Sequence, residues 1–330
     1  MLEAELIKPE ELNEIEAKSA LFLVPDYILA EFKKSFNKIK SKNLFGASFP
    51  AILYDGEVYF DRLLALTFDF EVKGFRGCEF PEVDIKDAET LLVFGDGMWS
   101  NFDDILEKVY LKLGNKVSYL GGGAGSFLSS TSYLFDKKGF FSKDALFLVL
   151  PFKTNFAYDH GWETTGYSFI STKTSGRKIE ELDWVEAFET YRRTLMELGV
   201  ELSKENFFEI SKYYPFGVIR MKKHVVRDPI YLEGNSIVCA GKVAQNQILD
   251  LLYGEKEKII EAAKKCCEKI ENREIVFDCV SRQIFLEKDF EKEKKLFRGC
   301  FGALTIGEVA CSKGFAEILN KTVVIGEFYV

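Results

Sequence analysis

The stretch TLLVFGDGMWSNFDDILEKVYLKLGNKVSYLGGGAG, from Thr90 to Gly125, contains the pattern that decides the fold. An apolar run, Thr90–Asp96, comes first, and a second run ends in a glycine cluster, Gly121–Gly125. Between them the apolar residues recur at the helical spacing of three and four: Phe102, Ile105, Leu106, Val109 and Leu113. Apolar runs that alternate with helical segments of this length predict right-handed βαβ units.

The same order of segments occurs three times in the chain. Each copy contains a strand, a helix, a second strand with glycine, a hairpin or loop, and a closing strand that returns beside the first two. We therefore predict an α/β fold with mixed α+β elements, in which repeated β-α-β-hairpin units form two mixed sheets flanked by helices, layered α-β-β-α. The strands expected besides those above are Ala20–Pro25, Asn43–Ser48, Leu63–Phe68, Ala145–Phe152, Glu274–Cys279, Leu296–Gly302 and Thr322–Gly326.

A less regular region, roughly residues 160 to 270, separates the second copy from the third. Thr172–Arg177 has the composition of a turn and precedes an amphipathic segment, Leu182–Leu198. The chain of 330 residues is long enough for about two domains. We therefore predict one domain over residues 1–178 and a second over 179–330.

Charge and composition exclude several classes of function. Forty-four basic and 52 acidic residues leave a net charge of -8, whereas a nucleic-acid or anionic-membrane binder needs a basic face. The acidic N-terminus does not resemble a signal peptide, and the longest apolar run is too short to span a membrane. Seven cysteines without C-x-x-C spacing indicate reduced thiols. We expect a cytoplasmic protein. Its many Lys and Glu residues indicate an organism that grows at high temperature.

The common cofactor and catalytic motifs are absent from the sequence. It contains no P-loop, no HExxH, no GxSxG and no complete GxGxxG. Its only two histidines are His160 and His224. The sequence therefore implies no cofactor and no metal.

The candidate ligand-binding residues follow the first strands of the copies. Ligands of open α/β sheets collect at the carboxyl ends of strands, so Arg282 could hold a carboxylate and Asp96 an ammonium group. Together they would suit an amino-acid-like zwitterion. The backbone of Gly123, Ala124 and Gly125 could approach such a ligand closely. Structural roles are the alternatives: a helix cap for Asp96, an ion pair for Arg282, close packing for the glycines, and for Glu308 a solvent-facing strand position instead of a pocket carboxylate.

Ten short pieces in this order resemble the FIST family (F-box and intracellular signal transduction). They are NLFGAS, LLVFGDGMWSNFDDIL, YLGGGAGSFL, YDHGWETTG, KIEELDWVEAFETY, YPFGVIR, VVRDP, IVFDCVSR, CFGALTIGEV and LNKTVVI. The resemblance implies that a GG-A-G turn, a G-W turn at Trp162, a C-x-x-R motif at Cys279–Arg282 and a G-E motif at Glu308 matter for function. Ser126 and Trp184 depart from the family's pattern.

The resemblance implies a sensory module that binds a small molecule, with amino acids the usual ligand proposed. We therefore expect a non-enzymatic sensor whose pocket lies between the two halves, lined by the candidate residues. A separate signalling protein would be its partner, and neither nucleic acid nor membrane would be. Two alternatives remain: an enzyme of unknown reaction with Cys279 as nucleophile and His160 as base, and a protein-interaction scaffold.

Overall fold

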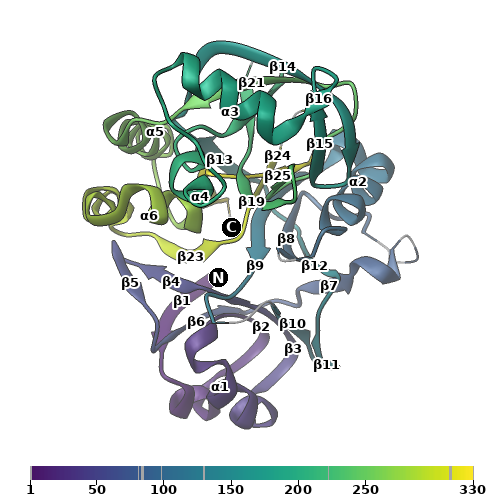
Figure 1. Ribbon diagram of the computed structural model, residues 1–330. Coiled ribbons are helices and arrows are strands. Elements are labelled where there is room, and N and C mark those ends of the chain that lie inside the picture. Colours follow the sequence, from purple (N-terminus) through teal and green to yellow (C-terminus); the bar gives the residue numbers. More distant parts are fainter. Residues whose placement is uncertain are drawn as a thin grey trace.

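In the computed structural model, each predicted copy is a unit of the same design (Figure 1). The structure describes residues 2–80, 82, 85–97, 99–128, 131–221, 223–311 and 314–329. Each unit has an edge strand, a first strand, a crossover helix, a second strand, a hairpin and a closing strand. Unit 1 comprises β1 (Leu2–Ile7), β2 (Glu16–Pro25), α1 (Leu29–Ser35), β3 (Lys40–Phe49), β4 (Ala51–Tyr54), β5 (Glu57–Tyr59) and β6 (Leu63–Phe68).

The second unit repeats this order with a longer crossover helix, whereas the third has two short helices in the crossover and an additional helix, α5, before its first strand. Unit 2 comprises β7 (Lys73–Arg76), β8 (Thr90–Asp96), α2 (Phe102–Leu113), β9 (Ser118–Ala124), β10 (Leu134–Asp136), β11 (Gly139–Phe141) and β12 (Ala145–Leu150). Unit 3 comprises β13 (Thr154–Asp159), α5 (Lys256–Lys269), β22 (Ile275–Cys279), α6 (Val280–Leu286), α7 (Phe290–Lys294), β23 (Phe301–Thr305), β24 (Glu308–Cys311), β25 (Ile318–Leu319) and β26 (Val323–Phe328).

Each unit builds one six-stranded mixed sheet, but its hairpin joins the sheet of a neighbour. In every unit the first and second strands pair in parallel and the closing strand pairs antiparallel with the first. The β4–β5 hairpin of unit 1 extends the sheet of unit 3, β10–β11 of unit 2 extends that of unit 1, and β24–β25 of unit 3 extends that of unit 2. This cyclic exchange of hairpins gives the body an approximate threefold symmetry.

One glycine occupies the same position in the second strand of every unit. A Cβ added to Gly121 would lie 1.9 Å from the carbonyl oxygen of Val93, and one on Gly302 would lie 1.7 Å from that of Val276. Gly46 stands in the same relation to Phe22, at 2.3 Å. The two parallel strands of each unit therefore approach too closely for any side chain.

The three sheets share one central hydrophobic core and each carries its own helix outside. Residues from all three sheets meet in that core, among them Leu23, Phe94 and Phe277. The outer faces are covered by α1, by α2, and by α5 with α7. Burying each such phenylalanine contributes about 2 kcal/mol or more. Both faces of every sheet are buried, which explains why the strands are continuous apolar runs.

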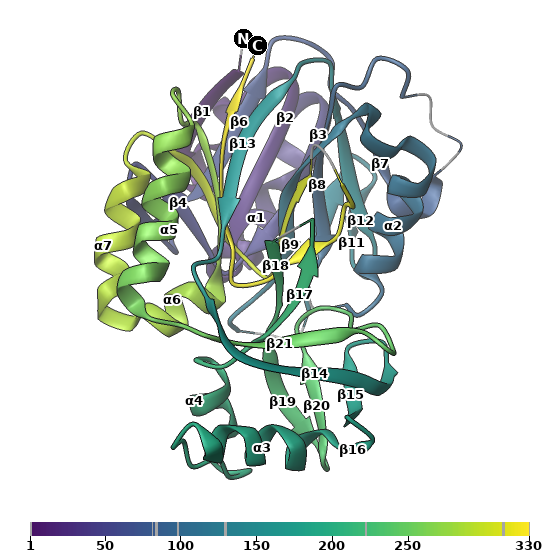
Figure 2. The same ribbon diagram turned by 90° about the horizontal axis from the view of Figure 1, so that it is seen from above.

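The region between β13 and α5 forms an insert at one end of the body (Figure 2). Its strands make an antiparallel sheet, and it has a hydrophobic core of its own. Its elements are β14 (Glu163–Ser175), β15 (Lys178–Leu182), β16 (Val185–Glu186), α3 (Ala187–Glu197), α4 (Phe207–Ser211), β17 (Phe216–Arg220), β18 (Lys223–Arg227), β19 (Pro229–Glu233), β20 (Ser236–Cys239) and β21 (Ile248–Tyr253).

The predicted mixed α/β class and the threefold repeat are confirmed. The number and layering of the sheets differ from the prediction, because each unit forms its own sheet around a common core and the insert adds a fourth. The division into domains at residue 178 stays a prediction; that residue begins β15. No helix in the described ranges has the length and apolar character needed to cross a bilayer.

Candidate functional site

The insert covers the end of the body at which β8 and β22 finish. Arg177 of the insert donates hydrogen bonds to the carbonyl oxygens of Gly97 (3.4 Å) and Trp99 (2.9 Å), directly after β8. Asp228 of the insert lies 3.1 Å from the ammonium of Lys321. The neighbouring Thr322 accepts a hydrogen bond from the backbone N–H of Cys279, the last residue of β22. This covered end is the place where ligands of α/β sheets usually bind.

Arg282 is fully buried in this end of the body, and protein groups occupy all of its donors. Its Nε and Nη2 donate hydrogen bonds to the carboxylate of Glu293, at 3.0 and 2.7 Å. Asp278 Oδ1 lies 3.1 Å from the same Nε. The other N–H groups donate to three carbonyl oxygens, those of His160 (2.7 Å), Lys321 (3.2 Å) and Ile259 (3.0 Å). A guanidinium has five N–H donors, so none remains for the ligand carboxylate that the sequence led us to expect.

Glu308 and Cys279 are also sealed inside the protein. Glu308 accepts hydrogen bonds from the Thr305 hydroxyl (2.8 Å) and the Thr322 N–H (3.3 Å). Burial raises the pKa of Glu308 to about 8, against the hydrogen bonds that lower it. Glu308 is thus a buried carboxyl, and the solvent-facing position weighed from the sequence is wrong.

Cys279, the nucleophile in the enzyme alternative, lies in surroundings that disfavour its thiolate form. Burial and the Glu308 carboxyl raise the pKa of Cys279 well above its ordinary value, so the unreactive thiol form prevails at neutral pH. Burial lowers the pKa of His160 to about 4, and its Nδ1 accepts a hydrogen bond from the Trp162 N–H at 2.9 Å. The imidazole therefore stabilises the turn between His160 and Trp162.

Trp162 is packed and only 3% exposed. Its ring meets that of Phe285 at 5.1 Å, and the Lys321 ammonium lies 4.9 Å from its centroid. A Cβ on Gly254 would come within 2.4 Å of its indole nitrogen, which has no hydrogen-bond partner in the part of the chain that the structure describes. Trp162 thus lies against the buried Lys321–Asp228 pair.

Asp96 is hydrogen-bonded within unit 2, whereas the glycine cluster packs unit 2 against unit 3. The Asp96 carboxylate accepts hydrogen bonds from the Ser132 hydroxyl and the Lys143 N–H. A Cβ on Gly123 would lie 2.0 Å from the Ile306 carbonyl oxygen, and one on Gly125 would lie 2.0 Å from the Ile306 side chain. Ala124 accepts a hydrogen bond from the Gly97 N–H at 3.0 Å. The close packing weighed as an alternative for the glycines is therefore what the structure contains.

The predicted residues thus come together at one end of the body, but around buried contacts. Arg282, Cys279, Glu308 and Trp162 all lie near Lys321. Gly123 lies beside Gly307, because its N–H donates to the Gly307 carbonyl oxygen at 2.7 Å. Lys321 is only 1% exposed. Its sequence neighbourhood, LNKT, gave no sign that it would pair with Asp228.

A second pair that the sequence did not indicate joins the insert to α2. Arg177 Nη2 and Asp103 Oδ2 are 3.9 Å apart, and their side chains are 13% and 10% exposed. Within the described residues, Arg177 Nε and Asp103 Oδ2 have no hydrogen-bond partner. Burial raises the pKa of Asp103 and lowers that of Arg177. A buried polar group without a partner is costly, so this pair is incompletely satisfied.

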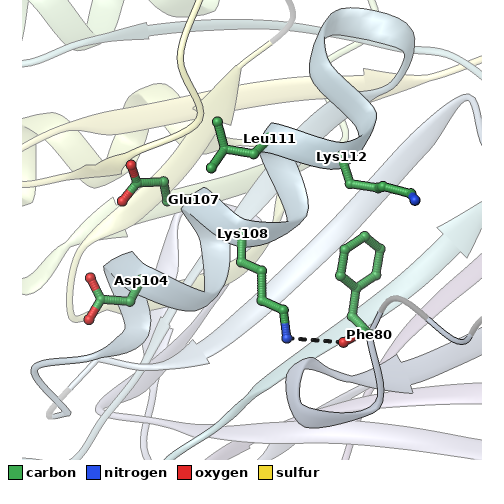
Figure 3. Close-up of a pocket in the computed structure, with 6 residues that line it drawn as sticks. All are labelled: Phe80, Asp104, Glu107, Lys108, Leu111 and Lys112. Carbon is green, nitrogen blue, oxygen red and sulfur yellow. Dashed lines mark hydrogen bonds between the residues drawn. The ribbon is translucent and has the colours of Figure 1, made fainter.

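The outer face of α2 has a separate shallow hollow of about 430 Å³ (Figure 3). Lys108 Nζ donates to the Phe80 carbonyl oxygen there, at 3.1 Å. None of the predicted site residues lines this hollow, which is bordered by Phe80, Asp104, Glu107, Lys108, Leu111 and Lys112. No group of three or more His, Cys, Asp or Glu residues in the described parts of the chain is arranged to hold a metal ion.

Comparison with known proteins defines the class. The FIST N domain model matches residues 21–185 and the FIST C domain model matches residues 187–311. The chain therefore belongs to the FIST family, whose domains are sensory domains of signal transduction.

Among the curated proteins, the chain is similar to an uncharacterized protein, MJ1623, of Methanocaldococcus jannaschii. The two are 24% identical over an alignment of 337 positions, which spans 86% of this chain and 65% of that relative. The match thus spans less than two thirds of the relative's length.

Proposed function

We propose that this FIST protein senses an amino acid or a similar small zwitterion, bound between the insert and the body. The observation that carries the proposal is the Arg177–Asp103 pair. Its two charged groups lie on opposite sides of that junction, 3.9 Å apart, and each has an unpartnered polar atom. We further propose that the protein acts in the cytoplasm and signals through a separate protein.

The chemistry of the pair matches a zwitterion. Arg177 already has two donors on the carbonyl oxygens of Gly97 and Trp99, so its guanidinium is held in place while Nε stays available. A ligand carboxylate could accept from Nε, and a ligand ammonium could donate to Asp103 Oδ2. Hydrogen bonds between charged groups are about twice as strong as neutral ones. A ligand would therefore supply the partners that this junction lacks.

A thermal-shift screen against the twenty protein L-amino acids and their deaminated analogues tests the proposal. Ligand at one hundred times its dissociation constant stabilises the folded chain by about 2.7 kcal/mol. We expect a shift with one group of amino acids, none with the analogues that lack the ammonium, and loss of the shift in Arg177→Gln and Asp103→Asn. The matched control is Arg192→Gln, which removes an arginine of the exposed Arg192–Glu189 pair. Equal shifts in all variants would contradict the site.

A further inference from the structure

The threefold design creates three equivalent seams around the body. In each unit the edge strand lies at the edge of its own sheet, and the unit's hairpin lies at the edge of a neighbouring sheet. Residues of β1 and β5 line one hollow, Arg76 of β7 contacts Phe141 of β11, and β13 and β25 both contact β18 of the insert. Leu6, Arg76 and Tyr158 occupy the same position of the three edge strands. They pair with Leu64, Leu146 and Val324 of the respective closing strands.

A strand of the insert fills the seam of unit 3. The Lys223 ammonium of β18 lies 5.1 Å from the centroid of the Tyr158 ring, on the β13 side. On the β25 side, Arg227 Nη1 donates to the Ile318 carbonyl oxygen at 3.1 Å, and Nη2 contacts Glu317 at 2.7 Å. Val225 and Val226, between these two basic residues, are buried against the body. This seam therefore holds an extended segment with apolar residues between basic ones.

Side chains of the body itself bridge part of the seam of unit 2, beside a hollow of about 520 Å³ that Lys73, Gly74 and Asp136 help to line. Arg76 of β7 lies 4.1 Å from the Phe141 ring of β11, and its Nε donates to Asp136 Oδ2 of β10 at 2.8 Å. The equivalent residue of unit 1 is Leu6, which cannot form such a bridge. Within the described residues, no hydrogen bond or ion pair joins the side chains of β1 to those of β4 or β5.

The seam of unit 1 contains a larger hollow, of about 710 Å³. Its lining combines apolar and aromatic side chains with two exposed acids, Glu5 and Glu11. Arg62 is the one basic residue that borders it. The residues that line it are Glu5, Leu6, Ile7, Glu11, Ile15, Tyr54, Tyr59 and Arg62.

We propose that the seam between β1 and β5 binds an extended segment of a partner protein in which apolar residues lie between lysine or arginine residues. The filled seam of unit 3 shows the kind of segment that this architecture accepts. The tyrosine rings can accept a cation on their faces, and the two glutamates complement its charge. This surface lies apart from the Arg177–Asp103 site and does not depend on a ligand there.

A peptide copied from the chain's own insert can test binding to this seam. A fluorescent peptide, MKKHVVRDP, has the sequence of residues 221–229, which includes β18. We expect saturable binding by fluorescence anisotropy. The affinity should fall about tenfold in Tyr59→Ala, which corresponds to about 1.4 kcal/mol, and also in the double variant Glu5→Lys, Glu11→Lys. Glu201→Lys, an exposed change on the insert, should leave it unchanged, and thermal melts should show that every variant is folded.

Several results would overturn the proposal. The first is that the peptide shows no saturable binding. The second is that a peptide with glutamate at its three basic positions binds as tightly as the original peptide. The third is that Tyr59→Ala and the double glutamate variant bind the peptide with the affinity of the parent protein. A loss of affinity in Tyr158→Ala instead of Tyr59→Ala would mean that the peptide enters the seam already filled by β18. Concentration-dependent dimers that disappear in Tyr59→Ala would assign the seam to a second copy of the chain, which also contradicts a partner segment.

Discussion

Two arginines at the end of the body that the insert covers, Arg282 and Arg177, are in opposite states. Arg282 has all five donors occupied by protein groups and is fully buried. Arg177 has a donor without a partner and stands beside an acid in the same condition. The difference lies in the donors of the two arginines: those of Arg282 are all used by the fold, although both carboxylate oxygens of Asp278 beside it lack a hydrogen-bond partner among the described residues, whereas Nε of Arg177 is left for a ligand.

The largest effect is expected from Arg282→Ala. The change removes the cation that faces Asp278 and Glu293, both fully buried, and leaves their charges uncompensated. Breaking a buried pair in this way costs about 3–5 kcal/mol. Urea denaturation should show that loss or a chain that fails to fold. A folded variant whose free energy of unfolding is less than about 1 kcal/mol below that of the parent would contradict the structural role given to Arg282.

A smaller effect, visible as a pH dependence, is expected from Glu308→Gln. The pKa of Glu308 is about 8 in the folded chain and near 4.5 in the unfolded one, so the folded state keeps the proton longer. Stability therefore falls as pH rises from about 4.5 to about 8, by up to about 1.4 kcal/mol per pH unit from this group. Denaturation at pH 5, 6 and 7 measures how the free energy of unfolding changes with pH. That free energy should fall less steeply with rising pH in Glu308→Gln than in the parent protein.

The exposed change Glu201→Gln serves as the control for that experiment, because it neutralises a carboxylate outside the network. It should retain the slope of the parent. Identical slopes for the parent and Glu308→Gln would mean that Glu308 does not keep its proton in the folded state.

The smallest effect on stability is expected from Asp103→Asn, and its sign separates the two arginine sites. Asp103 is buried and its Oδ2 has no hydrogen-bond partner, so neutralising it removes an unfavourable charge. We expect the ligand-free variant to be as stable as the parent, or up to about 1 kcal/mol more stable, while it loses ligand affinity. Chemical denaturation and calorimetric titration would measure the two quantities. A destabilised variant with unchanged affinity would assign Asp103 to the fold.

The sequence predicted much of the body but not its assembly. Apolar runs such as Thr90–Asp96 and the helical spacing of α2 indicate βαβ units, and three copies of that order appear as three units. The exchange of hairpins was not predictable, because β4–β5 has the same local pattern whichever sheet it joins. The glycine clusters were found, yet only the register with Val93 or Val276 shows that they allow close strand packing.

For the candidate site, too, the sequence predicted some of the residues but not their surroundings. Arg282 and Glu308 were identified as important residues, but their sequence positions do not reveal that they are fully buried among their own partners. Arg177 and Asp103 belong to different elements far apart in the chain, and neither forms a motif with its neighbours. Only the docking of the insert on α2 brings them together.

A crystal structure of the chain with the L-amino acid that gives the largest thermal shift tests the central claim most directly. The account predicts ligand density between Arg177 and Asp103, with the carboxylate on Nε and the ammonium on Oδ2, and an unchanged Arg282 network. Ligand density at Arg282, or a direct Arg177–Asp103 ion pair with the ligand bound elsewhere, would contradict it.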